Sequence, residues 1–491
     1  MKHVLLAVFF LLPALAGATS LRIGSKQFTE SVVLGELARR EALQAGVTVE
    51  HKRELGGTAI LWSALQHGDI DAYPEYTGTL TQELLKGIDP QADIATLRLR
   101  LAPMGIGITD SLGFDDNYAI GMRAQRAGEL GIRRISDLSA HPQLRLGFSN
   151  EFMDRGDGWP GLRQRYGLAA LQPRGLDHTL SYRALASGAV DAIDLYSTDA
   201  EIAYYHLSVL EDDRRYFPRY QAVFLYRLAL ERDAPGFVGA LKQLAGRIDE
   251  PAMRRMNAEA KLEGQRESDI AARFLGLSPE SHDDGFWTGL WHRTREHVGL
   301  AAASLALAVL VAVPLGIVAA RWRRLGQLVV GLTGVLQTVP SLAMFVFMIP
   351  LFGIGAWPAL AALFLYSLLP IVRNTHAGLL GIPLEWRESA AALGLPWLTR
   401  LRWIELPLAT RSILAGIKTA SVINVGTATL AALIGAGGYG QPILTGIRLN
   451  DIGLILEGAV PAALLAIMVQ LLFEGIERWL TPRGLRIVAR E

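Results

Sequence analysis

The side chains of this 491-residue sequence that are best placed to do chemistry are tyrosines. Eleven of the thirteen lie before residue 227, and four of these follow strand-like segments in turn-rich stretches: Tyr76, Tyr118, Tyr196 and Tyr220. Loops at strand ends are where α/β folds bind their ligands. We therefore expect these four rings to line a binding site, whereas many of the other tyrosines are ordinary core or surface residues.

A second constellation interrupts the apolar C-terminal half with the spacing E-x-A-x3-G-x9-I-x-L-P. It comprises Glu388, Ala390, Gly394, Ile404, Leu406 and Pro407. We expect a helix to begin at Glu388, where the helix dipole favours an anion, and to end at Gly394. Pro396 would then open a second short helix that reaches residue 403. Nearby arginines place this helix–turn–helix in the cytoplasm, because Arg-rich loops between membrane spans stay on that side. These arginines are Arg387, Arg400, Arg402 and Arg411.

Catalytic machinery is missing from the sequence. No G-x4-G-K-[ST] phosphate loop occurs, and the Lys–Thr pair within 416–419 lacks the glycine that must precede the lysine. The ten histidines show no H-E-x-x-H or clustered spacing, and the lack of cysteine excludes disulfides and cysteine-ligated metals. A formal net charge of +1 gives no reason to expect a nucleic-acid partner. We therefore expect no catalytic residue, no metal, no cofactor and no hydrolase activity.

The first half of the chain has the pattern of an exported α/β domain. Residues 1–18 are typical of a signal peptide, with an uncleaved anchor as the alternative. Residues 19–280 alternate short apolar strands with amphipathic helices. Within them, 62–72 recurs as 182–192, and each copy continues to a tyrosine five residues after the matched aspartate. Unless this is a chance likeness between generic α/β units, it predicts two similar lobes that each present an aromatic at the same depth.

The second half of the chain has the pattern of a membrane domain. We expect a polar linker over 281–297 and then five helices that cross the membrane, with the N-terminus outside and the C-terminus inside. The expected spans are 298–320, two within 325–372 joined by an external turn at 353–358, and then 413–434 and 452–473. Lys418 and Glu457 lie within or near the last two spans. They are either candidates for a transport path or ordinary charges near the ends of spans.

Both halves resemble parts of one transport system. The spacing around Glu388 resembles the EAA loop of ABC importer permeases, which docks into the ATPase subunit, with Ser389 where alanine is usual. Over nearly all of 21–277 the exported domain is similar to the periplasmic-type binding proteins for glycine betaine, choline and carnitine. Besides the tyrosine loops, the motifs that carry this resemblance are GSKQFTE (24–30), GGT (56–58), DGWPGL (157–162) and VLEDD (209–213). The resemblance implies a two-lobed α/β (type II) substrate-binding domain, followed by an all-α, five-helix permease domain of type I (298–491) with its coupling loop at 388–407.

The binding-protein resemblance also implies a ligand. In that family four tyrosines form a cage for a trimethylammonium group, and they match Tyr76, Tyr118, Tyr196 and Tyr220, with Tyr216 as an alternative to Tyr220. Gln27 and Thr79 match positions that hold the polar end of the ligand or tune selectivity. A quaternary ammonium has no N–H to donate, but each aromatic face in a desolvated site attracts it by about 1–2 kcal/mol. A cage of rings avoids the cost of burying an unpaired carboxylate.

The resemblance therefore implies a binding-protein–permease fusion in the bacterial inner membrane, with the binding domain outside. Its partners would be a quaternary ammonium small molecule, a separate ABC ATPase subunit, membrane lipid and a second copy of the chain, since one chain carries one coupling loop. Two alternatives stay open: an importer of another amine or of an amino acid, and a membrane-tethered sensor of the ligand. The sequence does not rank glycine betaine, choline and carnitine.

Overall fold

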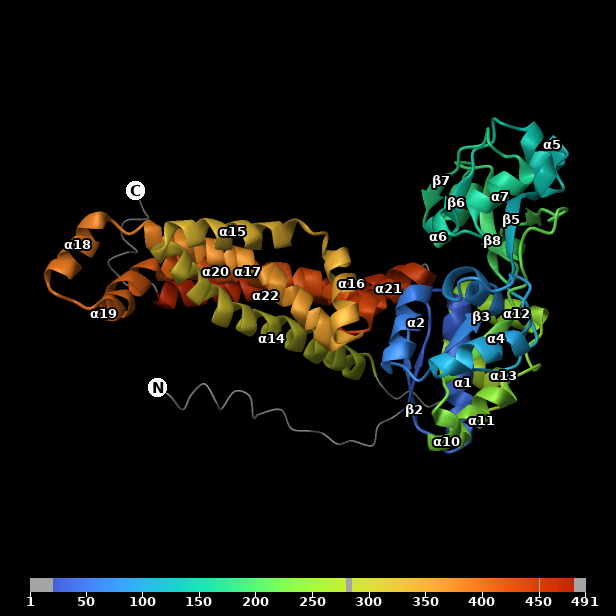
Figure 1. Ribbon diagram of the computed structural model, residues 1–491, viewed down its shortest axis with the longest axis horizontal. Helices are drawn as coiled ribbons and strands as arrows, with labels where there is room; N and C mark the ends of the chain where they lie inside the picture. Colours follow the sequence, from blue (N-terminus) through green and yellow to red (C-terminus); the bar gives the residue numbers. More distant parts are fainter. Residues whose placement is uncertain (1–20, 280–284, 450, 481–491) are drawn as a thin grey trace.

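The computed structural model describes residues 21–279, 285–449 and 451–480. Figure 1 shows an elongated molecule in which a two-lobed α/β domain caps one end of a helical bundle. The opposite end of the bundle is formed by helices α18 (Leu384–Ala392) and α19 (Trp397–Arg400). The predicted signal peptide (1–18) and the tail beyond residue 480 lie outside the described residues.

Lobe 1 lies next to the bundle and is built on a five-stranded sheet of order β2-β1-β3-β10-β4. β1 pairs in parallel with β2 and β3, whereas β10 runs antiparallel to β3 and β4. All five residues of β3 are buried, as expected of a central strand covered on both faces. The strands are β1 (Leu21–Gly24), β2 (Val49–Lys52), β3 (Ala72–Tyr76), β4 (Ile106–Ile108) and β10 (Ala222–Arg227). The main helices of this lobe are α1 (Thr29–Gln44), α2 (Thr58–His67), α4 (Ile94–Leu101), α11 (Pro235–Gln243), α12 (Glu250–Lys261) and α13 (Glu267–Phe274).

Lobe 2 is smaller and is built from the middle of the α/β sequence. β5 pairs antiparallel with β8 on one side and β9 on the other, and β6 pairs in parallel with β7. The strands are β5 (Tyr118–Arg123), β6 (Gly147–Ser149), β7 (Arg174–Leu176), β8 (Ala192–Tyr196) and β9 (Leu207–Val209). The helices are α5 (Ala124–Leu130), α6 (Asn150–Asp154), α7 (Trp159–Tyr166), α8 (His178–Ala186) and α9 (Glu201–Tyr204). The chain enters and leaves this lobe through neighbouring segments, which are joined by a bridge between Asp115 and Gln221.

The repeat in the sequence corresponds to equivalent units in the two lobes. In lobe 1, Asp71 accepts a hydrogen bond from the backbone N–H of Arg22 at 2.8 Å, and the Arg22 guanidinium bonds the Gly68 carbonyl at 2.7 Å. In lobe 2, Asp191 accepts from the Arg145 N–H at 3.0 Å, and Arg145 bonds the Gly188 carbonyl at 2.8 Å. These equivalent contacts confirm the prediction of two similar lobes. Each unit runs from a helix through a left-handed glycine to a strand that ends in a tyrosine.

The bundle contains four described helices that are long and apolar enough to cross a membrane, or five if the bent pair α15 and α16 is one span. The longer helices are α14 (Phe286–Arg321), α17 (Ala356–Leu380), α20 (Leu406–Thr427) and α22 (Ile452–Leu480). The shorter ones are α15 (Arg323–Thr338), α16 (Ser341–Phe352) and α21 (Gly440–Leu449). The larger count agrees with the predicted five-helix domain.

Two details of the bundle differ from the sequence-based expectation. α15 and α16 meet at 100°, because Pro340 has no N–H to continue the helix and holds Val339 in an extended conformation. The expected linker is helical from Phe286 onward, since nothing after that residue breaks the helix until well inside the first span. These first turns of α14 are anchored by Thr294, whose hydroxyl lies 2.7 Å from the hydroxyl of Tyr439.

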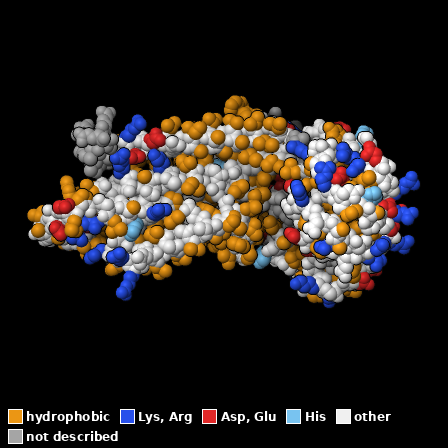
Figure 2. Space-filling view, turned by 90° about the horizontal axis from the view of Figure 1, so that it is seen from above, with side chains coloured by type: hydrophobic (Ala, Val, Ile, Leu, Met, Phe, Trp, Pro, Cys, Tyr) orange, Lys and Arg blue, Asp and Glu red, His pale blue; other side chains and the backbone are white. Residues whose placement is uncertain are grey.

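The surface of the bundle is that of a membrane protein. Figure 2 shows hydrophobic side chains over its middle and charged side chains mainly at its end and on the α/β domain. On α22, five large apolar side chains are 54–60% exposed: Leu464, Ile467, Met468, Leu471 and Leu472. Such a surface is suited to lipid or to another helical subunit rather than to water.

The two charged residues expected within or near spans both have ion-pair partners. Lys418 Nζ lies 3.9 Å from a carboxylate oxygen of Glu477, which also accepts from Arg411 at 3.2 Å. Glu457 pairs with Arg293 of α14. These pairs favour the interpretation of Lys418 and Glu457 as charges near the ends of spans.

Candidate ligand-binding site

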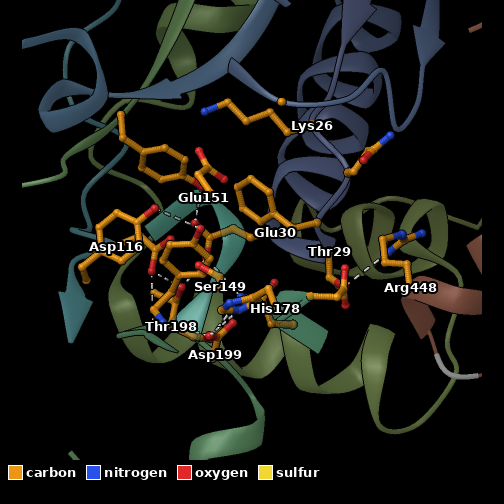
Figure 3. Close-up of a pocket in the computed structure, with 18 of the residues that line it drawn as sticks. Lys26, Thr29, Glu30, Asp116, Ser149, Glu151, His178, Thr198, Asp199 and Arg448 are labelled. Carbon is orange, nitrogen blue, oxygen red and sulfur yellow. Dashed lines mark hydrogen bonds and ion pairs between the residues drawn. The ribbon is translucent and has the colours of Figure 1, made fainter. Parts of the chain in front are cut away.

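A cavity of about 260 Å³ lies between lobes 1 and 2. The structure places all six residues predicted for ligand binding in its wall: Gln27, Tyr76, Thr79, Tyr118, Tyr196 and Tyr220. Figure 3 shows residues of both lobes converging on the cavity, with Lys26 and Glu30 from lobe 1 and Ser149 and His178 from lobe 2. The site is therefore assembled from segments that are far apart in the sequence.

Strand ends position the tyrosines. β3 ends at Tyr76, β5 begins at Tyr118 and β8 ends at Tyr196. The register places Tyr118 directly opposite Tyr196, and opposed residues of antiparallel strands share one face of a sheet. Tyr220 comes just before β10, which pairs with β3 so that Ala222 lies opposite Tyr76.

The rings form one aromatic cluster. The ring centroids of Tyr118 and Tyr196 are 5.0 Å apart, and those of Tyr118 and Tyr220 are 5.5 Å apart with the planes at 80°. Phe28 connects this group to lobe 1, with centroid distances of 6.3 Å to Tyr76 and 5.9 Å to Tyr196. Phe28 was not predicted as a site residue. It lies within the GSKQFTE motif, and its aromatic ring could have identified it as a candidate for a site that binds a cation.

Tyr216, the alternative to Tyr220, is directed elsewhere. Its hydroxyl oxygen lies 3.2 Å from the carbonyl oxygens of both Gly156 and Gly158, in the loop before α7, and can donate its one hydrogen to either. Tyr220 is 2% exposed, lines the cavity and donates its hydroxyl to Asp157. The geometry therefore favours Tyr220 over Tyr216 as a cavity residue.

The cavity presents the four rings as neutral phenols. Burial raises the pKa of Tyr76, Tyr118, Tyr196 and Tyr220 well above the ordinary value. The hydroxyl of Tyr76 donates to Glu30 at 2.6 Å, and those of Tyr118 and Tyr196 lie 3.3 Å apart. With the hydroxyls engaged in this way, the ring faces remain as the surfaces that can attract a cation.

Two carboxyl groups in the cavity wall share one hydroxyl. Thr198 Oγ1 lies 2.5 Å from Glu30 Oε2 and 2.6 Å from Asp116 Oδ1. A hydroxyl donates only one hydrogen, so one of the two carboxyl groups must itself carry a proton to make the second bond. Burial raises the pKa of Glu30 to about 7, although hydrogen bonds from Thr198 and Tyr76 oppose the rise. Burial also raises the pKa of Asp116 well above its ordinary value.

The cationic side chains contributed by the α/β domain to the cavity wall are already paired. The pairs are Lys26 with Glu75, Arg155 with Asp157, His178 with Asp199, and Lys261 with Glu201. Burial alone would lower the pKa of His178, but the Asp199 carboxylate raises it above the ordinary value. Within the described chain, Glu30 and Asp116 have no cationic partner of this kind. A cation in the cavity would supply one.

A second candidate site is a groove of about 550 Å³ at the end of the bundle opposite the α/β domain. Of the predicted coupling residues, Ala390, Ile404 and Pro407 line it, and Leu406 is the first residue of α20. Gly394 follows α18 with φ +73°, a left-handed conformation that favours glycine. The surface here exposes large apolar side chains, which suits contact with another protein: Trp386, Leu393 and Trp403 are 59%, 79% and 70% exposed.

The helices of this segment differ from the expectation in two ways. Glu388 does not begin the first helix: α18 starts at Leu384, directly after Pro383, and Glu388 is exposed in its middle. Proline suits a helix start because its missing N–H needs no partner there, so the acidic residue of the first turn is Glu385. The second helix does not stop at residue 403, since α19 continues through a π-helical turn (Leu401–Glu405) into α20.

Comparison with known proteins shows relatives of both halves. Residues 19–276 match the family described as the substrate binding domain of ABC-type glycine betaine transport systems, and residues 312–485 match the binding-protein-dependent transport system inner membrane component. The osmoprotectant import permease protein OsmW of Salmonella typhimurium is 45% identical over 198 residues, which are 39% of this chain and 92% of that protein. The choline transport system permease protein OpuBB of Bacillus subtilis is 43% identical over 197 residues, which are 40% of this chain and 91% of that protein. A crystal structure of a glycine betaine/carnitine/choline ABC transporter is 29% identical with a TM-score of 0.47, and covers 52% of this chain and 98% of that one.

Proposed function

The chain belongs to the family of substrate-binding domains of ABC-type glycine betaine transport systems, joined in one polypeptide to a binding-protein-dependent inner membrane component, and we propose that it imports quaternary ammonium osmolytes such as glycine betaine, choline or carnitine. The observation that carries the proposal is the aromatic cavity between the lobes. Tyr76, Tyr118, Tyr196 and Tyr220 surround the ligand's trimethylammonium group, and Phe28 adds a fifth ring.

The chemistry of the cavity fits a permanent cation. Aromatic faces attract a trimethylammonium group without needing an N–H, at about 1–2 kcal/mol for each desolvated contact. Glu30 and Asp116 add an acidic pair that is bridged by the Thr198 hydroxyl and has no cationic partner in the described chain. Gln27 and Thr79 supply polar groups for the other end of the ligand, and their position in the same wall supports that role.

In the proposed cycle the binding domain lies outside the inner membrane and its lobes close around the ligand. A separate ATPase subunit hydrolyses ATP and binds the groove at the opposite end of the bundle, where it contacts Glu388, Ala390, Gly394, Ile404, Leu406 and Pro407. Two copies of the chain form the permease, because one chain contributes a single coupling segment. The apolar face of α22 is available for that contact or for lipid.

The proposal is tested by titrating the full-length chain in lipid nanodiscs with matched ligand pairs. Choline is compared with ethanolamine, and glycine betaine with glycine, because each pair differs only in the three methyl groups on nitrogen. The trimethylated member should bind about tenfold tighter or more, since a primary ammonium keeps its hydration shell. Equal binding within both pairs would instead indicate an importer of another amine or of an amino acid.

A further inference from the structure

The α/β domain contacts the bundle through lobe 1 in every interdomain hydrogen bond and ion pair of the described residues. One contact is at the loop between α16 and α17, where the backbone N–H of Ile354 donates to Asp69 at 3.2 Å. Ile354 also packs against apolar clusters of both domains. Lobe 2 lies away from the bundle (Figure 1), and none of these contacts involves a residue of lobe 2.

The second contact is a buried cluster of charges around Arg448. This residue is next to the last of α21, yet its side chain enters lobe 1 and is only 7% exposed as a residue. Its guanidinium donates through Nε to Glu54, and through Nη2 to Glu267 at 2.6 Å. Glu54 and Glu267 are 5% and 4% exposed, and Glu54 accepts a further bond from Thr445 at 2.9 Å.

The surroundings of Glu54 and Glu267 favour pairing of their carboxylates with a cation. Burial would raise the pKa of Glu267, but the charges of Arg448 and Arg53 hold it below the ordinary value. Glu54 has φ +59°, a left-handed conformation that is uncommon for a residue other than glycine and persists only where the surrounding structure holds it. A planar guanidinium can bond two carboxylates at once, which a lysine ammonium does less well.

Arg448 also reaches the ligand cavity. Its Nη1 lies 3.4 Å from the hydroxyl of Thr29, the first residue of α1, and Arg448 and Thr29 both line the cavity between the lobes. Figure 3 shows Arg448 at the edge of this site, beside Thr29 and on the side away from Asp116. The neighbours of Thr29 in the chain are Phe28 and Glu30, which belong to the cage and to the acidic pair.

We propose that Arg448 is a docking clamp, which holds lobe 1 on the permease through Glu54 and Glu267 at the edge of the ligand cavity. Without Arg448, Glu54 loses its ion-pair partner and Glu267 keeps only Arg53 at 3.4 Å, and a buried carboxylate left without its cation is strongly unfavourable. Without Arg448, lobe 1 should therefore dissociate from the permease, because separation returns the carboxylates of Glu54 and Glu267 to water. The clamp keeps the cavity facing the bundle while lobe 2 opens and closes.

The proposal is tested by crosslinking in the full-length chain, which has no cysteine of its own. Asp69→Cys and Ile354→Cys place a thiol on each side of the first contact, and the disulfide formed with copper phenanthroline in nanodiscs is quantified as a linked peptide pair by mass spectrometry. Adding Arg448→Ala should slow crosslinking about tenfold or more. Arg448→Lys should give an intermediate rate, because a point charge replaces a two-carboxylate fork. No ligand is needed, so the result is independent of the proposed cargo.

Two further variants separate a clamp from general destabilisation. Arg273→Ala removes an exposed ion pair with Glu259 inside lobe 1 and should leave crosslinking unchanged. The triple variant Arg448→Met, Glu54→Gln, Glu267→Gln removes all three charges of the clamp, while Arg53 keeps its ion pair with Glu36 at 2.5 Å. It should recover most of the crosslinking lost in Arg448→Ala, since neither glutamine carries an uncompensated charge. Crosslinking at the parent rate in Arg448→Ala, or no recovery in the triple variant, overturns the proposal.

Discussion

Tyr118 and Tyr196 lie directly opposite each other on β5 and β8, with their ring centroids 5.0 Å apart and their hydroxyls 3.3 Å apart. This pair is the part of the aromatic cluster that lobe 2 contributes. Tyr76 and Phe28 complete it from lobe 1, so the cluster closes only when the two lobes approach each other. The energetics of the cavity can therefore be tested one ring at a time.

Truncation of a ring should weaken binding. Tyr76→Ala or Tyr196→Ala should each reduce choline affinity by about 1–2 kcal/mol or more, which is about 5- to 30-fold, whereas Phe at the same position should retain most of it. Titration of the full-length chain measures the effect. Tyr204→Ala is the matched control, because Tyr204 is 60% exposed and does not line the cavity. If both alanine variants bind like the parent, the cage assignment is wrong.

Binding of a cation should depend on pH through Glu30. Burial raises its pKa from about 4.5 to about 7, and the titratable groups next to it are Tyr76, Asp116 and Asp199. A trimethylammonium ligand favours the carboxylate, so choline affinity should rise between pH 6 and pH 8 and proton release should accompany binding near pH 7. Calorimetry in two buffers of different ionisation enthalpy measures that proton. Glu30→Gln should remove the pH dependence, and a parent affinity that is flat over this range would contradict the prediction.

The same carboxyl makes a prediction for the ligand-free fold. The folded state binds the Glu30 proton more tightly than the unfolded state, so unfolding releases a proton between about pH 4.5 and pH 7. The contribution of Glu30 to stability is therefore greatest below about pH 4.5, falls as pH rises through this window and is constant above it. The melting temperature of the parent, relative to that of Glu30→Gln, should therefore fall as pH rises from about 4.5 to about 7. A parent that gains stability from Glu30 as pH rises would refute it.

The segment around Glu388 should couple transport without touching the ligand. Glu388→Lys reverses a charge on the exposed middle of α18, and Gly394→Trp forces a large side chain into a left-handed turn. Choline uptake by cells should fall strongly in the double variant, whereas choline affinity of the purified chain should stay unchanged, because the cavity lies at the opposite end of the molecule. Glu474→Lys, a charge reversal on α22 outside the groove, serves as the control. Uptake that survives the double change at normal expression excludes this segment as the coupling element.

The assembly should contain two permease copies. The most apolar 18-residue stretch of α22 is only 11% buried within one chain, and the chain carries a single coupling segment. Native mass spectrometry of the detergent-solubilised protein should give the mass of two chains, 53.4 kDa each before any processing. A single copy in the assembled transporter would contradict the homodimer.

The sequence by itself determined the features that depend on neighbouring residues. The apolar stretches were long enough to predict the five-helix domain, the α/β pattern and its repeat predicted two lobes, and the left-handed glycine after α18 was expected at Gly394. The four tyrosines of the cavity could be predicted because the end of a strand is recognised from neighbouring residues in the sequence. The predicted start of α18 at Glu388 was wrong, since the helix begins directly after Pro383 and that choice depends on where the chain leaves α17.

Only the tertiary structure decided which distant residues meet. Glu30 and Asp116 share the hydroxyl of Thr198, and Arg448 of the bundle bonds Glu54 and Glu267 of lobe 1. Phe28 likewise became part of the cluster only through the approach of β3 and β8. Periodicity and propensity report how a segment folds against its own neighbours. They carry no information about which buried surfaces pack together, and it is that packing which strips water from these charges and rings and makes them interact.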